Sequence, residues 1–238
     1  MKFLIVGLLL AGCACTEISD RRQISLEAVE KLRATIPHYQ TAQDYAVKSM
    51  SEAKRNASVI LSNFYHIVFE TKITALVNIL EEEASTMNYA KSVDEWCWES
   101  NVPLLEGTMG WVGNDFSECA RQLDGLIAEV VASTYNQFHA DEAEIKKISL
   151  LDVLQRRNII SNPKSIIDAI ENLEIDIERT VPELGDLLSN FETELNDKIP
   201  GYSGCLKNSV QQRTRQIEFL KGETIKCLAE QKKQKSLH

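Results

Sequence analysis

The chain has 238 residues, of which 44% are hydrophobic and 26% charged, and its formal net charge is −9. This composition excludes a wholly disordered chain, because the hydrophobic fraction is that of an ordinary globular protein. The acidic surplus argues against nucleic acid, or an anionic membrane, as a general partner.

The first fifteen residues have the order of a secretory signal peptide. One lysine precedes an apolar run from Phe3 to Ala11, and small residues follow that run. The run is too short to cross a membrane, which needs about 20 apolar residues. We therefore expect cleavage near Ala14 or Cys15, which leaves residues 16–238 as a single helical domain secreted into an extracellular fluid.

A second interpretation of the same segment is a bacterial lipobox. The tetrapeptide LAGC at residues 10–13 places a cysteine after a glycine, the arrangement in which that cysteine becomes the lipid-anchored first residue. Bacterial signals usually carry more positive charge than the single Lys2, and such lipoproteins less often hold four further cysteines. Secretion is therefore the main expectation, and a lipid anchor at Cys13 is the alternative.

Beyond the leader, apolar residues recur at steps of three and four, which is the spacing of amphipathic helices. A short helix is expected over Ser25–Ile36, and it ends before Pro37. Neither glycine nor proline occurs from Gln40 to Val102, so a long helix is expected over about 41–97. Further helices are expected over about 117–140, 163–199 and 205–232.

The longest loop is expected over Glu99–Asp115. This segment contains Pro103 and three glycines, and Cys97 and Cys119 flank it. Long loops in compact domains tend to be functional or tied down. We therefore predict a constrained loop that is the least regular part of the mature domain, without continuous helix through its glycines, Gly107, Gly110 and Gly113.

Two further breaks are expected near the end of the chain. The sequence TVPE at residues 180–183 is a capping-box pattern with a proline, so the helix over 163–199 kinks or restarts there. Pro200-Gly201 predicts a firm stop before the last helix. Because no stretch alternates as a strand would, the expected fold is all-α, an elongated antiparallel helical bundle stapled by two disulfides.

Four cysteines lie beyond the leader, an even number that suits two disulfides in an exported chain. Cys97 and Cys119 are 22 residues apart, and so are Cys205 and Cys227. This equal spacing hints at a duplicated hairpin, although the neighbouring residues do not align well. If the last helix is continuous, Cys205 and Cys227 are roughly 33 Å apart, whereas a disulfide needs Cα atoms within about 7 Å.

A bond between Cys205 and Cys227 is therefore excluded, and Cys97–Cys119 is excluded with it if all four cysteines pair. The nested pairing joins Cys119 to Cys205 and Cys97 to Cys227, and the crossed pairing joins Cys97 to Cys205 and Cys119 to Cys227. Cys119 and Cys205 each open a predicted helix, and in an up-and-down bundle those two helices begin at the same end. We therefore prefer the nested pairing, with the crossed one as the alternative.

Few other residues suggest chemistry. The sequence NAS at residues 56–58 makes Asn56 a candidate glycan acceptor. His66 with Glu70, and His139 with Asp141 and Glu142, are candidate halves of a metal site or an acid–base pair, but no motif spacing supplies the remaining ligands. Nucleophile and phosphate-binding motifs do not occur either. We therefore expect no catalysis, no cofactor and no metal, and these pairs are expected to be solvated surface contacts.

All three tryptophans, Trp96, Trp98 and Trp111, cluster around Cys97 and the predicted loop. The main expectation is a small satellite core that covers a disulfide. The alternative is an apolar or aromatic binding surface, because tryptophan is enriched where proteins bind.

The chain resembles insect secreted proteins that carry the tsetse EP domain. The matching features are Cys97, Cys119, Cys205 and Cys227, the helical stretches between them and a eukaryotic-style leader. The Glu-Pro repeat tail of some family members is missing, since only eleven residues follow Cys227. The resemblance implies a secreted insect protein of gut, saliva or reproductive tract, without established enzymatic activity.

The sequence as a whole predicts a secreted, non-catalytic helical protein that acts as a binding or structural component of an extracellular fluid. A second hypothesis is a carrier that holds an apolar small ligand between its helices. The third is the lipid-anchored bacterial lipoprotein. The expected partner is an extracellular protein or an apolar ligand, with no nucleic acid and no transmembrane segment.

Overall fold

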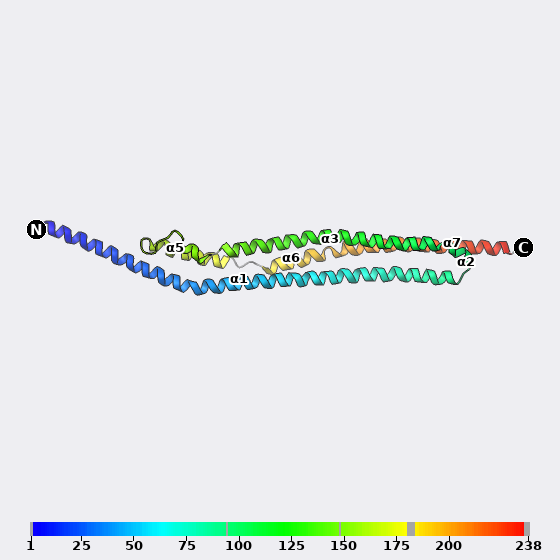
Figure 1. Cartoon of the computed structure of the whole chain (residues 1–238), viewed down its shortest axis with the longest axis horizontal. Helices are drawn as coiled ribbons and strands as arrows, with labels where there is room; N and C mark the ends of the chain where they lie inside the picture. The colour runs from blue at the N-terminus through cyan, green and yellow to red at the C-terminus, as the bar shows by residue number, and fades with distance from the viewer. Residues whose placement is uncertain (1, 94, 148, 180–183, 236–238) are drawn as a thin grey trace. The chain divides into compact units, whose positions relative to one another are not determined.

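The structure is a computed structural model that describes residues 2–93, 95–147, 149–179 and 184–235. These residues form seven α-helices and no strand, which confirms the predicted all-α fold (Figure 1). In chain order the helices are α1 (Lys2–Lys91), α2 (Glu95–Glu99), α3 (Val102–Lys147), α4 (Leu150–Leu154), α5 (Pro163–Arg179), α6 (Leu184–Asn196) and α7 (Ile199–Lys235).

The chain divides into two compact units. Unit 1 comprises residues 1–56 and 135–187, and unit 2 comprises residues 57–134 and 188–238. The helices α1 and α3 each contribute one part to each unit. All four cysteines beyond the predicted leader belong to unit 2.

Helix α1 continues through Pro37, so the predicted helix end at Ile36 and the predicted new start near residue 41 are wrong. Proline removes one backbone hydrogen bond, which leaves the carbonyl of Arg33 without its usual donor. Arg33 is exposed, and the Thr41 hydroxyl donates to the Pro37 carbonyl at 2.9 Å. Buried residues continue on both sides of the proline, and their packing outweighs its local cost.

An eleven-residue repeat explains how such long helices keep one face buried. In α1 every eleventh residue from Thr35 to Ala90 is buried, and in α3 the same holds from Leu105 to Phe138. Eleven residues make three turns of about 3.67 residues, close to the 3.6 of a straight α-helix. The buried stripe therefore drifts little around the helix axis.

The predicted loop over Glu99–Asp115 is wrong, because α3 begins at Val102 and runs on through all three glycines. Each glycine costs a helix about 1 kcal/mol relative to alanine. The glycines lie on the exposed face, while the opposite face buries four side chains that pack in the core: Leu105, Thr108, Val112 and Phe116. Burying this face offsets the glycine cost.

The other helix limits also differ from the predicted ones. The long helix ends at Lys91 instead of about 97, and the predicted helix over 117–140 is part of the longer α3. The predicted helix over 163–199 is divided into α5 and α6, and the predicted break at residues 180–183 lies outside the described residues. Helix α7 starts at Ile199, so Pro200-Gly201 forms its first turn, where the N–H that proline lacks has no partner inside the helix.

Unit 1 has a small aliphatic core that joins α4 and α5 to α1. The Ser25 hydroxyl donates to the Ile159 carbonyl at 3.0 Å, and Lys31 pairs with Glu171 at 2.6 Å. The buried residues of this core are Ala28, Val153, Ile166, Ile170 and Leu173.

Unit 2 contains the end of α1 from residue 57, all of α2, α3 up to residue 134, most of α6, and α7. Its buried side chains include aromatic rings from different helices. They include Phe64 of α1, Phe116 of α3, Phe191 of α6 and Tyr202 of α7.

Candidate functional site

Two disulfides tie α7 to α2 and α3 within unit 2, and they have the nested pairing preferred from the sequence. Cys97 joins Cys227 with Cα atoms 5.8 Å apart, and Cys119 joins Cys205 with Cα atoms 5.9 Å apart. Cys119 follows Cys97 in the chain, whereas its partner Cys205 precedes Cys227, the partner of Cys97, by the same number of residues. The equal spacing therefore marks two rungs between antiparallel segments, and a duplicated hairpin is not its cause.

Polar contacts set the position of α7 between these rungs. The Asp115 carboxylate accepts hydrogen bonds from the Ser209 hydroxyl at 2.8 Å and from the Arg213 guanidinium at 2.8 and 3.0 Å. Near the other rung, the Asn101 amide donates to the Thr224 hydroxyl at 2.9 Å. With the disulfides, these bonds hold the register and rotation of α7 against α3.

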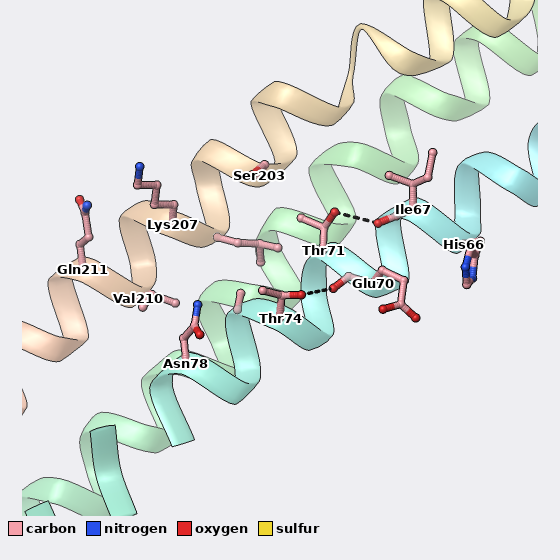
Figure 2. A pocket seen from close by; sticks show the side chains of 12 residues that line it. His66, Ile67, Glu70, Thr71, Thr74, Asn78, Ser203, Lys207, Val210 and Gln211 are labelled. Carbon is pink, nitrogen blue, oxygen red and sulfur yellow. Dashed lines mark hydrogen bonds between the residues drawn. The ribbon is translucent and has the colours of Figure 1, made fainter. Parts of the chain in front are cut away.

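A groove of about 800 Å³ runs between α1 and α7 in unit 2 (Figure 2). On α1 its lining extends from His66 to Asn78, about 18 Å of helix at 1.5 Å per residue. Leu206, which is buried, and the partly exposed Val210 supply apolar surface from α7. The groove is therefore long and has an apolar floor.

Thr71 and Thr74 of α1 make the groove less polar than threonine side chains usually would. The Thr71 hydroxyl donates to the Ile67 carbonyl at 2.7 Å, and the Thr74 hydroxyl donates to the Glu70 carbonyl at 2.9 Å (Figure 2). Both hydroxyl hydrogens are thus engaged by the helix backbone. What these side chains offer a ligand is mainly a methyl group and a weak acceptor.

Charged groups of both signs line the same groove. His66 and Glu70, one of the two predicted acid–base pairs, are exposed on α1, and Lys207 is exposed on α7. In the described part of the chain, no cluster of three or more His, Cys, Asp or Glu residues is arranged to hold a metal ion. The mixed charge gives the groove no strong preference for an anion or a cation.

The second predicted pair, His139 with Glu142, lies in unit 1. Their closest atoms are 3.7 Å apart, but Glu142 has a nearer partner in Lys54, at 2.6 Å. The hydrogen bond from Lys54 is the main cause that lowers the pKa of the Glu142 carboxyl, and the charges of Lys54, Lys146 and His139 add to it. The Lys54–Glu142 ion pair joins α1 to α3, so Glu142 has a structural partner on another helix.

Asn56, the predicted glycan acceptor, is exposed on α1, and so is Ser58. The side chain that would receive a glycan therefore faces solvent. Glycosylation itself stays a prediction.

The tryptophans divide into one buried and two exposed side chains. Trp98 is buried next to Cys97, as expected of a satellite core over a disulfide. Trp96 and Trp111 are exposed, so the expected satellite core does not include them. Trp111 lines a second groove. The sequence does not indicate this groove, because it predicts a loop at Trp111, where α3 is helical.

None of the helices in the described residues has a stretch that is long and apolar enough to cross a membrane. No protein-family model, curated protein or solved structure matches this chain.

Proposed function

We propose that this chain is an exported, non-catalytic binding protein that holds an elongated, neutral, apolar ligand in the groove between α1 and α7. The observation that carries the proposal is the groove itself, with about 800 Å³ and an apolar floor between two helices. This volume lies within the range of ordinary ligand pockets.

The surface chemistry supports an apolar and uncharged ligand. Leu206, Val210 and the threonine methyl groups favour contact with hydrocarbon, and the engaged threonine hydroxyls are poor nucleophiles. Glu70 and Lys207 carry opposite charges, so neither sign of ligand charge gains a clear advantage. Asn78 and Gln211 offer amide groups to one polar atom on the ligand.

Export is supported by the leader-like order of residues 1–15 and by the two disulfides, because disulfides persist in oxidising compartments. The resemblance to insect secreted proteins with the tsetse EP domain supports the same conclusion and adds a gut, salivary or reproductive fluid as the place of action.

Native mass spectrometry of the chain collected from the culture medium of expressing insect cells tests export and cargo together. We expect a chain that starts after Cys15 or close to it, with a co-purified neutral lipid. A chain recovered only inside the cells, with Met1 intact, contradicts export.

Titration with the neutral dye Nile red tests the groove. Val210→Arg is expected to weaken dye binding at least about tenfold, because it places a charge on the apolar wall. Val77→Arg is the matched control, since Val77 is an exposed valine of α1 outside the lining. Equal dye binding by the wild type and the two variants contradicts the assignment of this groove as the ligand site.

A further inference from the structure

A second groove of about 530 Å³ lies between α3 and α7 in unit 2. Three large apolar side chains line it and are more than half exposed: Leu104 at 57%, Trp111 at 58% and Phe219 at 65%. Single exposed apolar residues are normal, but a group of them around one groove marks an interaction surface. A macromolecular partner can cover all three side chains at once and so remove this apolar surface from water.

The charge of this groove is opposite to that of the chain. Arg213 and Arg215 line it and no acidic residue does, although the formal net charge of the chain is −9. Arg213 is already engaged, because it donates to Asp115 and its guanidinium lies 6.0 Å from the centroid of the Trp111 ring. Arg215 forms no ion pair with any other described residue, so an acidic group is its natural complement.

The shape of the groove favours a helix as the partner element. At Gly107 an added Cβ would meet nothing within 4 Å, so a bulky partner side chain can approach the α3 backbone there. The backbone groups of α3 and α7 are paired within their helices, which leaves no sheet edge for a partner strand. A helix that lays its apolar face into the groove is a common mode of peptide recognition, and it requires no free backbone groups of the groove.

We propose that the groove between α3 and α7 docks an acidic amphipathic helix of a partner protein. The apolar face of that helix covers Leu104, Trp111 and Phe219, and an aspartate or glutamate on its flank pairs with Arg215. The combination of a tryptophan with arginines is typical of residues that dominate binding energy in interfaces. The site is independent of the α1/α7 groove, because it has a different lining and a charged partner.

The test selects peptides on the full disulfide-bonded chain. A displayed library of helical peptides about five turns long carries a fixed leucine stripe, and its flanking positions vary among Glu, Lys and Gln. We expect wild type to enrich glutamate at the flanks, and the Arg215→Glu chain to enrich lysine at the same positions. This exchange of preference is a result that mere loss of folding does not produce.

Fluorescence anisotropy of the selected peptides then measures the apolar contact. Phe219→Ala is expected to weaken binding at least about tenfold. Phe69→Ala is the matched control and is expected to leave binding unchanged, because Phe69 is 61% exposed on α1 and outside the groove. Equal helix content by circular dichroism shows that each variant is folded.

Three results overturn the proposal. The first is a selected pool without charge preference at the flanks, and the second is a pool that binds Phe219→Ala as tightly as wild type. The third is binding of phosphatidylglycerol vesicles that depends on Phe219 while no peptide is enriched, since that result assigns the surface to a membrane.

Discussion

Unit 1 and unit 2 both use parts of α1 and α3, but they hold them by different means. Unit 2 has two disulfides and the Asp115–Arg213 contact, and its buried side chains include several aromatic rings. Unit 1 has an aliphatic cluster where α4 and α5 meet α1, the buried ring of Phe138, and ion pairs such as Lys31–Glu171. Both grooves proposed here as binding sites lie in the unit with the covalent rungs.

The difference indicates which part of this helical chain can expose apolar side chains for binding and stay folded. A groove binds well when its walls need no ordering, because immobilising them costs free energy at the moment of binding. In unit 2 the rungs at Cys119–Cys205 and Cys97–Cys227 keep α7 in register with α2 and α3, and so fix both walls of the α3/α7 groove even while apolar side chains stay exposed. Unit 1 depends on packing and on noncovalent polar contacts, so we expect it to tolerate less exposure.

Removing one rung is expected to have the largest effect. The double variant Cys119→Ala, Cys205→Ala opens a link between residues 86 positions apart, which costs about 4 kcal/mol of unfolding free energy. Hydrogen exchange checks the location of the loss: amides of unit 2 lose protection, while those around Ile170 in unit 1 keep it. Equal loss of amide protection in both units contradicts the expectation that the disulfide stabilises unit 2 selectively.

Truncating the unit 1 core is expected to come next. Ile170→Ala removes a fully buried side chain and costs about 2–4 kcal/mol, measured by urea unfolding. In this variant we expect amides of unit 1 to lose hydrogen-exchange protection, while those of unit 2 keep it. Ile160→Ala is the control, since Ile160 is exposed and its truncation is expected to cost less than about 0.5 kcal/mol.

Replacing three of the four glycines of α3 is expected to stabilise unit 2. The triple variant Gly107→Ala, Gly110→Ala, Gly113→Ala gains about 2 kcal/mol, because each glycine is helical and an added Cβ meets nothing within 4 Å. Thermal unfolding measures the gain. A lower melting temperature would mean that this segment is the irregular loop that the sequence suggests.

A backbone position in unit 1 is expected to give a smaller gain. Arg156, just after α4, has φ of 59°, a left-handed conformation that costs a non-glycine residue about 1 kcal/mol. Arg156→Gly is expected to recover most of that in urea unfolding. Gln155→Gly is the control, because Gln155 has φ of −64° and gains nothing from glycine.

The smallest expected effect concerns pH and unit 1. The pKa of Glu142 is lowered in the folded chain, so its bond with Lys54 contributes stability above the ordinary carboxyl pKa of 4.5. That contribution is lost as the pH falls below 4.5 through the lowered pKa, and we expect about 0.5 kcal/mol for a partly exposed pair. Glu142→Gln removes this part of the pH dependence, and Glu144→Gln controls for the loss of one surface carboxylate. An unchanged acid slope in Glu142→Gln contradicts the assignment.

The disulfide pairing shows what sequence reasoning can reach. One fact narrowed the choice: a helix keeps residues 205 and 227 far apart, so they do not bond to each other. The nested pairing is present, but not because Cys119 and Cys205 open helices that start at one end: α3 begins at Val102, α7 begins at Ile199, and the bonded segments run antiparallel. The exclusion of Cys205–Cys227 is therefore predictable before any tertiary structure is known, whereas the choice between the nested and the crossed pairing is not.

The glycines and proline show where the same reasoning stops. At Pro37 and at Gly107, Gly110 and Gly113, local preference argues for a break by about 1–3 kcal/mol per residue. The continuous helices exist because the opposite face packs on other parts of the chain, which local preference does not contain. The wrong loop prediction also concealed the position of Trp111, since its place on a groove wall requires helix at Gly110 and Gly113.

By itself the sequence determined the helical class, the expectation of a leader and the exclusion of a Cys205–Cys227 bond, because periodicity, hydrophobic order and helix rise are local properties. Only the tertiary structure decided that α1 and α3 run unbroken, that Trp98 is buried while Trp111 is exposed, and that two grooves flank α7. A groove is made by two helices far apart in the chain, and its walls depend on how α7 is rotated against α1 and α3. That rotation follows from the sum of many side-chain contacts and from the Asp115–Arg213 bond, none of which the spacing of residues along one helix contains.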